Sequence, residues 1–379
     1  MTSPHHLIAD EKKTTQKNRL AHTNMEQREE KNIVAPDGIL LLDKPAGRTS
    51  HDCVNEIRRL YGTKKVGHAG TLDPMATGLL VVLLGRAAKA SDCMTEKDKH
   101  YQAILQLGLT TDTQDITGRV LSKSTAPLPD EQTVKDTAAL FCGAQQQIPP
   151  MYSALKIHGK KLVDLARQQI TVERQPRDIF VYALTVVPVS DGAYDMQVYC
   201  SKGTYIRTLC ADIGEKLGCG GVMASLRRTQ SGSFSIRDAI TLDALAQMTT
   251  EERLRQLRPV ETLFSDLPII RLPAFYDRLA KNGCEIYLHK LRGVSLQMPK
   301  SAGEQIPTVL QALSVGTRVR LYDENGFWAL GEVQRCVPQA NNQVCYTTPN
   351  DRTSAQKTVR QPDGQAQNAI RAIKRFVLP

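Results

Sequence analysis

The chain has 379 residues, a formal net charge of +10 and a pI of about 9.1, and this length allows two domains and a tail. A hydrophobic content of 41% with 23% charged residues is typical of globular proteins and excludes fibrous and wholly disordered classes. No apolar run approaches the roughly 18–20 residues that a membrane span requires. A basic surface attracts polyanions, so the charge favours nucleic acid over a neutral small molecule as the partner.

The cysteines and the N-terminal segment indicate a compartment. None of the nine cysteines forms a C-x-x-C pair, so the sequence indicates neither a zinc site nor a redox dithiol, and scattered thiols fit a reducing environment. The first 35 residues lack the apolar block of a signal peptide and are too acidic for a transit peptide. We therefore predict a cytoplasmic protein with a polar, disordered tail over 1–36, no metal, no cofactor and no membrane contact.

Taken in chain order, the first elements alternate between strand and helix. The apolar block 38–45 ends at a proline and predicts a buried strand. Ser50 is the expected N-cap of a helix over 51–61. A glycine-rich loop over 62–78 leads into the apolar run 79–84, which is typical of a central strand. Alternating polar and apolar residues over 101–107 predict a half-exposed strand.

Further along, helical spacing predicts helices over 131–142 and 156–170, strands over 179–188 and 194–200, and an amphipathic helix over 206–217. Strands and helices mix without regular βαβ alternation, so we expect an α+β fold with a mixed, largely antiparallel sheet and flanking helices. Prolines cluster around 258–272. A hairpin over 315–336 and a last strand over 372–378 then predict a small β-rich module. The expected domains are 37–265 and 266–379.

One loop holds a candidate catalytic carboxylate. The segment 67–78 contains Asp73 and His68 just before the predicted central strand. An Asp-Pro turn is more often structural, with its carboxylate bonded to backbone amides. Here a basic helix end runs into the loop, and a cation can hold a carboxylate ionised beside a reacting centre. Both readings stay open at this point.

A strand-to-helix junction over 200–209 supplies a candidate cation. Arg207 and Tyr205 lie in the first turn of the predicted helix, off its apolar stripe. They form either a solvent-facing turn or a carboxylate partner and a contact for a flat ligand such as a base. Tyr101, taken alone, is typical of a half-buried core tyrosine. The basic segment 149–161 either is a solvated loop or binds a nucleic-acid backbone, and no phosphate-binding, dinucleotide-binding or calcium loop is present.

Six segments together resemble, in order, the TruB-type tRNA pseudouridine synthases. The resemblance spans about 38–265, and the pair GxLDPxATG and SKGTYIR at this separation is highly specific. The C-terminal region is only loosely similar to the PUA domain of such enzymes, mainly through Gly-Glu-Val at 331–333. The six segments are GILLLDKPAGRTS (38–50), GHAGTLDPMATGLL (67–80), KHYQAILQLGLTTDTQD (99–115), IPPMYSALKIHGKKLVDLAR (148–167), SKGTYIRTL (201–209) and SLRRTQSG (225–232).

The resemblance implies a cofactor-independent enzyme that flips a uridine out of the TΨC loop of tRNA, at position 55, and isomerises it to pseudouridine. Asp73 matches the catalytic aspartate, and Arg207 matches the arginine that keeps that aspartate ionised. Tyr101 matches the tyrosine that stacks on the flipped base. His68 matches the histidine that occupies or props the vacated place in the RNA.

The same resemblance assigns the remaining site residues. Tyr205 and Leu226 match further residues around the uracil, and Lys44 lies in a matching strand end where it is either structural or phosphate-facing. We expect the tRNA T-arm as partner, recognised by shape, with no obligate protein partner. The expected RNA contacts are the basic stretch containing Lys160 and Lys161, then Arg227, Arg228 and the C-terminal module.

Three alternatives stay open. The same chemistry on another RNA, such as ribosomal RNA directed by a guide particle, would need protein partners, whereas the short catalytic segments favour a stand-alone enzyme. A non-catalytic RNA-binding or RNA-folding protein is disfavoured by the intact set of Asp73, Tyr101 and Arg207. An RNA N-glycosidase also needs a carboxylate and a flipped base, and only the product distinguishes it.

Overall fold

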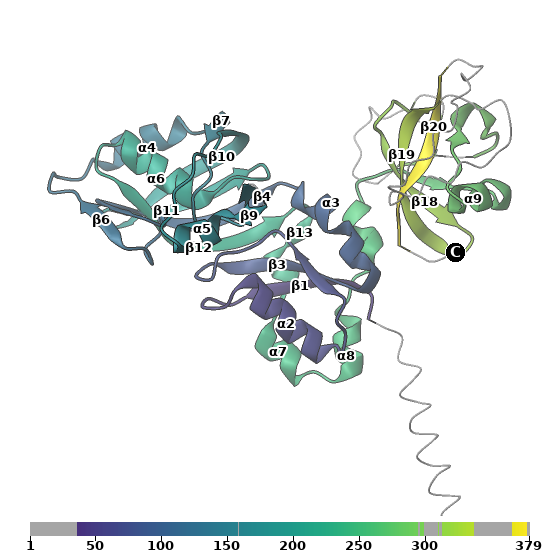
Figure 1. Cartoon of the computed structure of the whole chain (residues 1–379), viewed down its shortest axis with the longest axis horizontal. Helices are drawn as coiled ribbons and strands as arrows, with labels where there is room; N and C mark the ends of the chain where they lie inside the picture. The colour runs from purple at the N-terminus through teal and green to yellow at the C-terminus, as the bar shows by residue number, and fades with distance from the viewer. Residues whose placement is uncertain are drawn as a thin grey trace, which may run out of the picture. The chain divides into compact units, whose positions relative to one another are not determined.

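The computed structural model describes residues 36–157, 159–294, 296–298, 310, 313–336 and 366–376. The predicted polar tail before residue 36 and the stretch 337–365 lie outside the described residues. Most of the described strands belong to two sheets, one of ten strands and one of six (Figure 1). No helix within these ranges is long and apolar enough to cross a membrane.

The larger sheet confirms the predicted mixed, largely antiparallel architecture. Its order is β14-β1-β3-β12-β4-β11-β10-β7, with β13 beside β12 and β2 beside β3. Of the described pairs in it, β1–β14 and β3–β12 are parallel and the others antiparallel. The strands are β1 (Gly38–Lys44), β2 (Val66–Ala69), β3 (Thr77–Leu84), β4 (Lys99–Leu107), β7 (Gly143–Gln147), β10 (Arg177–Ser190), β11 (Ala193–Cys200), β12 (Gly221–Ser231), β13 (Phe234–Ser235) and β14 (Ile240–Thr241).

Strand β3 is buried on both faces, which explains its uninterrupted apolar sequence. Leu80, Val82 and Leu84 pack into one hydrophobic cluster, while the alternate residues Leu79, Val81 and Leu83 pack into another. A strand with two covered faces needs apolar side chains at every position. Because full burial of one such side chain contributes about 1.5–3 kcal/mol, β3 is a stable base for the loop that precedes it.

Helix α2 (Ser50–Leu60) begins one residue earlier than the sequence predicts. Thr49, not Ser50, is its N-cap: the Thr49 hydroxyl accepts from the amide of Asp52, and the Asp52 carboxylate accepts from the amide of Thr49. This reciprocal capping box fixes the first turn. Because Thr49 caps the helix, the Ser50 hydroxyl can make a different contact, and it donates to the carbonyl of Leu72 at 3.1 Å.

Helices cover the larger sheet in two places. In Figure 1, α2 and α7 (Leu242–Gln247) lie beside β1 and β3, and α4 (Glu131–Ala139) and α6 (Ile206–Lys216) lie beside β10 and β11. Residues of α2, α4, α6 and α7 join one apolar cluster with β4, β10 and β11. Two further short helices, α3 (Ser91–Thr95) and α8 (Thr250–Arg255), also lie in this part of the chain, together with short 3-10 segments.

The helix predicted over 156–170 is confirmed only over α5, Leu162–Arg167. Before it, β8 (Lys156–Ile157) and β9 (Lys160–Lys161) pair as an antiparallel hairpin. Gly159 has φ +80°, a left-handed conformation that turns the hairpin and that a helix does not contain. The apolar residues that suggested a helix lie in its second half, where the helix does form.

The smaller sheet has the order β16-β20-β19-β18-β15-β17. The predicted hairpin is present, because β18 and β19 pair across a turn in which Gly326 has φ +123°. The last strand begins earlier than predicted and ends at Arg375. The elements are β15 (Ile269–Arg271), α9 (Ala274–Lys281), β16 (Ile286–Tyr287), β17 (Leu296–Gln297), β18 (Arg318–Asp323), β19 (Gly326–Cys336) and β20 (Gln367–Arg375).

Candidate active site

The loop between β2 and β3 holds Asp73, and side chains from other elements fix its main chain. Every second carbonyl of the loop from residue 70 to residue 76 accepts a hydrogen bond from such a side chain. These bonds run from Arg228 Nη2 to Gly70 O (3.0 Å), from Ser50 Oγ to Leu72 O (3.1 Å), and from Lys44 Nζ to Pro74 O (3.2 Å) and Ala76 O (2.6 Å). Buried carbonyls need such donors, and together they fix the position of the loop that carries the carboxylate.

Asp73 forms a two-point ion pair with Arg207, the second residue of α6. Arg207 Nε lies 2.9 Å from Asp73 Oδ2, and Nη2 donates to Oδ1 at 3.3 Å. The guanidinium also donates to the carbonyls of Thr113 and Tyr152 at 3.1 and 2.8 Å. The Arg207 side chain is 6% exposed and that of Asp73 is 32% exposed. The arginine therefore orients the carboxylate from inside, and one side of the carboxylate stays open to a ligand.

A second carboxylate, Asp115, lies on the other side of the guanidinium, 3.7 Å from Arg207 Nη1. Its Oδ1 accepts from the hydroxyls of Thr113 and Thr117 at 2.9 and 2.6 Å, and from the amide of Thr117 at 3.0 Å. Sequence reasoning missed this role of Asp115. The available signal was the pair of threonines two residues before and after it, since a buried carboxylate needs nearby donors.

Opposing influences act on the pKa of the Asp73 carboxyl. Burial raises the pKa of the Asp73 carboxyl above its ordinary value, Arg207 opposes this rise, Asp115 adds to it and Lys44 opposes it. The resemblance implied that Arg207 keeps the aspartate ionised. In the structure Arg207 lowers the pKa of Asp73 but does not fully offset its burial, so the carboxylate is more basic than an exposed aspartate.

Lys44 contacts the Asp73 loop, and Leu226 lies on β12. Lys44 is fully buried, and its ammonium donates to the carbonyls of Pro45, Pro74 and Ala76, so it holds the loop and does not present its charge at the surface. Burial lowers the pKa of Lys44. Leu226 is buried on β12 opposite Ala103 of β4.

Two of the predicted site residues are tyrosines, on β4 and just before α6. Tyr101 lies on β4, paired with Val198 of β11, and is half-buried against the main apolar cluster. Tyr205 precedes α6, and its amide donates to the Gln147 side chain at 2.8 Å. Burial raises the pKa of both phenols, and the charge of Asp73 acts in the same direction on each. Contact of either ring with a base at Asp73 stays a prediction.

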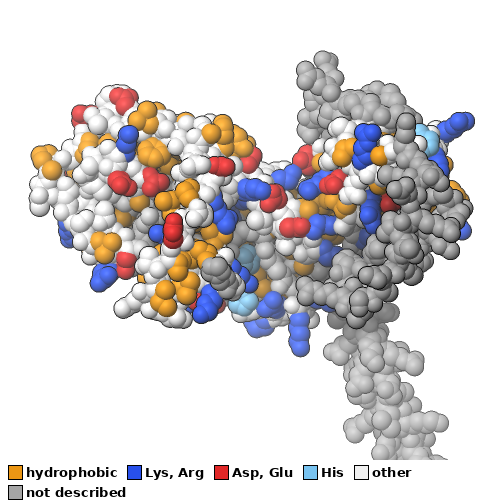
Figure 2. All heavy atoms as spheres, turned by 45° about the horizontal axis from the view of Figure 1, so that its top comes forward, with side chains coloured by type: hydrophobic (Ala, Val, Ile, Leu, Met, Phe, Trp, Pro, Cys, Tyr) orange, Lys and Arg blue, Asp and Glu red, His pale blue; other side chains and the backbone are white. Residues whose placement is uncertain are grey.

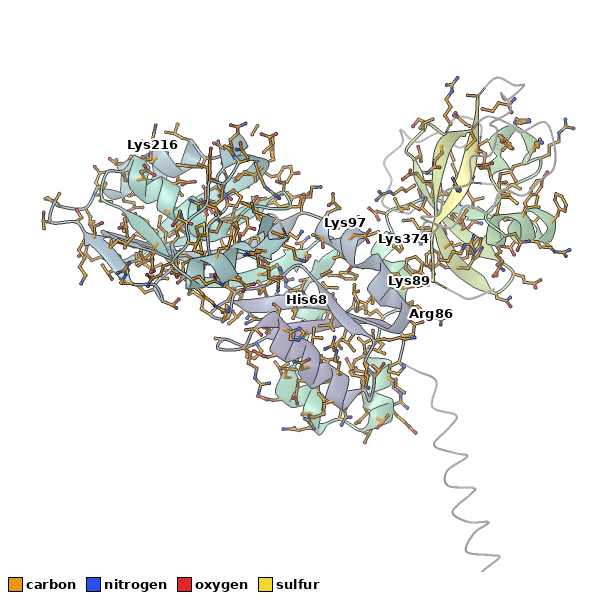
Figure 3. All side chains as sticks on the ribbon, viewed as in Figure 1. His68, Arg86, Lys89, Lys97, Lys216 and Lys374 are labelled. Carbon is orange, nitrogen blue, oxygen red and sulfur yellow. The ribbon has the colours of Figure 1, made fainter. Side chains whose placement is uncertain are left out.

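The remaining predicted residues are His68, Lys160 and Lys161. His68 lies on β2 opposite Val82 (labelled in Figure 3), and its Nδ1 has no hydrogen-bond partner in the described part of the chain. Burial and the nearby Arg228 lower the pKa of His68. Lys160 and Lys161 are exposed on β9.

Arg228 corrects a prediction. It was expected to contact RNA at the surface, but it is only 1% exposed and its guanidinium donates to the carbonyls of Leu79 and Gly70. The preceding residue Arg227 is partly exposed and pairs with Asp43 at 2.7 Å. Successive strand residues point to opposite faces of a sheet, so only one of two adjacent arginines can face solvent.

The surface carries both signs of charge. Figure 2 shows Lys and Arg side chains interspersed with Asp and Glu on the face it displays, with hydrophobic side chains between them. Among the described residues, no group of three or more His, Cys, Asp or Glu side chains is placed to hold a metal ion.

Comparison with known proteins identifies the family. Residues 58–206 match the model of the TruB family pseudouridylate synthase N-terminal domain, and residues 207–265 match the tRNA pseudouridylate synthase B C-terminal domain. A protein named tRNA pseudouridine synthase B from Syntrophotalea carbinolica is 46% identical over 236 residues, which cover 62% of this chain and 77% of the relative. A protein of the same name from Burkholderia mallei is 44% identical over 289 residues, covering 76% and 90%.

A solved structure shares the fold. In the crystal structure of a Cbf5–Nop10–Gar1 complex, the matching chain is 23% identical with a TM-score of 0.62, over 90% of this chain and 86% of that chain. The N-terminal family model covers Asp73, and the C-terminal family model covers Arg207. The chain belongs to the TruB family of pseudouridine synthases.

Proposed function

We propose that this protein isomerises a uridine of tRNA to pseudouridine, and that its target is the uridine at position 55 in the TΨC loop. One observation carries the proposal: a carboxylate held at two points by a buried arginine, on a fixed loop, with one side open. The relatives named tRNA pseudouridine synthase B support tRNA as the substrate.

The reaction is an isomerisation that adds and removes no atoms overall, so it needs no oxidant, reductant or group donor. The N1–C1′ bond breaks, the uracil turns over, and a bond forms between C5 and C1′. C5 then loses its proton to solvent, and N1 gains a proton. Asp73 has a charge held in place by Arg207 and, with its side chain 32% exposed, enough access to act on the sugar or the base. The target base is stacked within folded RNA, so it must first be flipped out to reach the carboxylate.

The other site residues receive roles around the flipped base. We assign Tyr101 to stacking on the uracil, Arg207 to holding Asp73, and Tyr205 and Leu226 to the walls of the uracil pocket. His68 would take the place in the RNA that the base leaves.

Lys44 supports the Asp73 loop, and Lys160 and Lys161 would contact phosphates of the T-arm. The catalytic part would span 37–265, and an RNA-binding, PUA-like module would span 266–379. We expect a stand-alone enzyme of the cytoplasm. All eight cysteines in the described ranges are free thiols, as is usual in a reducing compartment.

Tritium release from a tRNA transcript labelled with [5-³H]uridine tests the proposal, because the C5 proton leaves only if C5 becomes the glycosidic carbon. The product RNA is then mapped to locate the modified position. Release mapped to position 55 is the expected result. Binding without release would refute the proposed activity on tRNA, and release mapped elsewhere would refute the T-loop assignment. Free uracil as the product would instead indicate an N-glycosidase.

A further inference from the structure

Arg228 is a buried cation that neither the catalytic pair nor the RNA surface explains. It is 1% exposed, and among the described residues its guanidinium donates to two main-chain carbonyls and forms no ion pair with a carboxylate. The neighbouring Arg227, by contrast, has Asp43 as its partner. A buried charge without a counter-ion costs free energy unless its hydrogen bonds are satisfied. Its position therefore calls for a specific role.

Arg228 contacts both ends of the Asp73 loop. On the incoming side, Nη2 donates to Gly70 O at 3.0 Å. On the outgoing side, Nε donates to Leu79 O at 2.7 Å, and the main chain of Arg228 pairs in parallel with Gly78. The approach is so close that a Cβ on Gly78 would lie 2.3 Å from the Arg228 carbonyl oxygen. One residue of β12 thus fixes the separation of the two points between which the loop runs.

Arg228 also lies beside a residue expected to contact the base. It is the register partner of Tyr101 on the adjacent strand β4. Burial raises the pKa of the Tyr101 phenol, and the charge of Arg228 opposes that rise. Its charge also lowers the pKa of His68. The residue that fixes the Asp73 loop is therefore also the neighbour of Tyr101 across the strand pair.

We propose that Arg228 is a positioning residue for the isomerisation, because its guanidinium fixes both ends of the Asp73 loop while its place on β12 is paired with Tyr101. It thereby sets the distance between carboxylate and ring. This inference rests on the proposed function. The planar guanidinium can donate in several fixed directions at once. A lysine at the same position keeps the charge but donates from a single nitrogen, so it cannot hold both carbonyls in the same geometry.

The test measures rate and binding separately on the full chain. Arg228→Lys and Arg228→Met are compared with the parent under single-turnover conditions, with saturating enzyme and [5-³H]uridine-labelled tRNA, and the Kd for tRNA is measured by filter binding. Arg253→Lys and Arg253→Met serve as matched controls. Arg253 also donates to two main-chain carbonyls, of Leu245 at 3.2 Å and Leu60 at 2.7 Å, but it lies on α8 outside the site.

We expect Arg228→Lys to slow the single-turnover rate by about 10- to 100-fold and Arg228→Met by about 100-fold or more, since a misplacement of about 1 Å at a reacting centre has effects of this size. The Kd should stay within about threefold of the parent, and the Arg253 variants should keep the parental rate. If Arg228→Met does not fold, Arg228→Lys decides the question.

Two results would overturn the proposal. One is an Arg228→Lys protein that turns over within about threefold of the parent rate. The other is a loss of rate accompanied by an equal loss of tRNA binding and of thermal stability, which would make Arg228 structural only. A parent protein that binds tRNA without releasing tritium would refute the proposed function itself, and so is distinct from both.

Discussion

Replacing Arg207 by methionine should damage both stability and turnover. The change removes the two contacts to Asp73, the 3.7 Å approach to Asp115 and the donors to the carbonyls of Thr113 and Tyr152. Because the Arg207 side chain is 6% exposed, the two carboxylates lose their shared cation in a poorly solvated place. Breaking a buried pair in this way costs about 3–5 kcal/mol. For a domain of this size, that loss lowers Tm by roughly 10 °C.

The rate should fall by about 100-fold or more, because Asp73 loses the two-point contact that orients it. Arg207→Lys keeps the charge but not the fork, so it should recover part of the stability and little of the rate. Differential scanning fluorimetry and single-turnover tritium release measure the two effects on the same samples. An Arg207→Met protein that melts within about 2 °C of the parent, or turns over within about tenfold, would refute this account of the pair.

Three further predictions follow from the site. Burial raises the pKa of Asp73, so the turnover rate should rise with pH until the carboxylate is ionised. Because the folded pKa lies above the unfolded one, the stability that Asp73 contributes is lost as pH rises through the folded pKa. Melting curves of Asp73→Asn should therefore show a Tm that increases relative to that of the parent over the same pH range. Replacing Lys160 and Lys161 together by alanine should weaken tRNA binding and reduce the salt slope by roughly two in filter-binding titrations, and an unchanged slope would exclude both lysines from the interface. Gly78→Ala should lower Tm far more than Gly62→Ala, because a Cβ meets the Arg228 oxygen at 2.3 Å at the first position and nothing within 4 Å at the second.

The sequence predicts most of the larger sheet because local pattern and tertiary packing agree there. The run 79–84 within β3 is apolar at every position, as expected of a strand that is buried on both faces. The pairing of β8 with β9 was missed because their three lysines are exposed and show no strand periodicity, and Gly159 alone signals the turn.

The site is less fully predictable, because it is assembled from distant segments. Asp73 and Arg207 lie 134 residues apart, and only the resemblance to a family pairs them. Arg228 was predicted to be exposed, and the role of Asp115 was missed, for the same reason: a charged residue is usually solvated, and its burial depends on tertiary neighbours that the local sequence does not reveal. The N-cap of α2 fell on Thr49 because its partner is Asp52, three residues on, which leaves Ser50 to hold the loop.

Single-turnover tritium release and tRNA affinity of Asp73→Asn, measured beside the parent, test whether the Asp73 carboxylate performs the isomerisation. Asparagine keeps the size of the side chain and removes its charge. We expect no detectable release by Asp73→Asn and a Kd within about threefold of the parent. Release near the parental rate would rule out a catalytic role for the carboxylate, and a parallel loss of binding would show that Asp73 is structural instead.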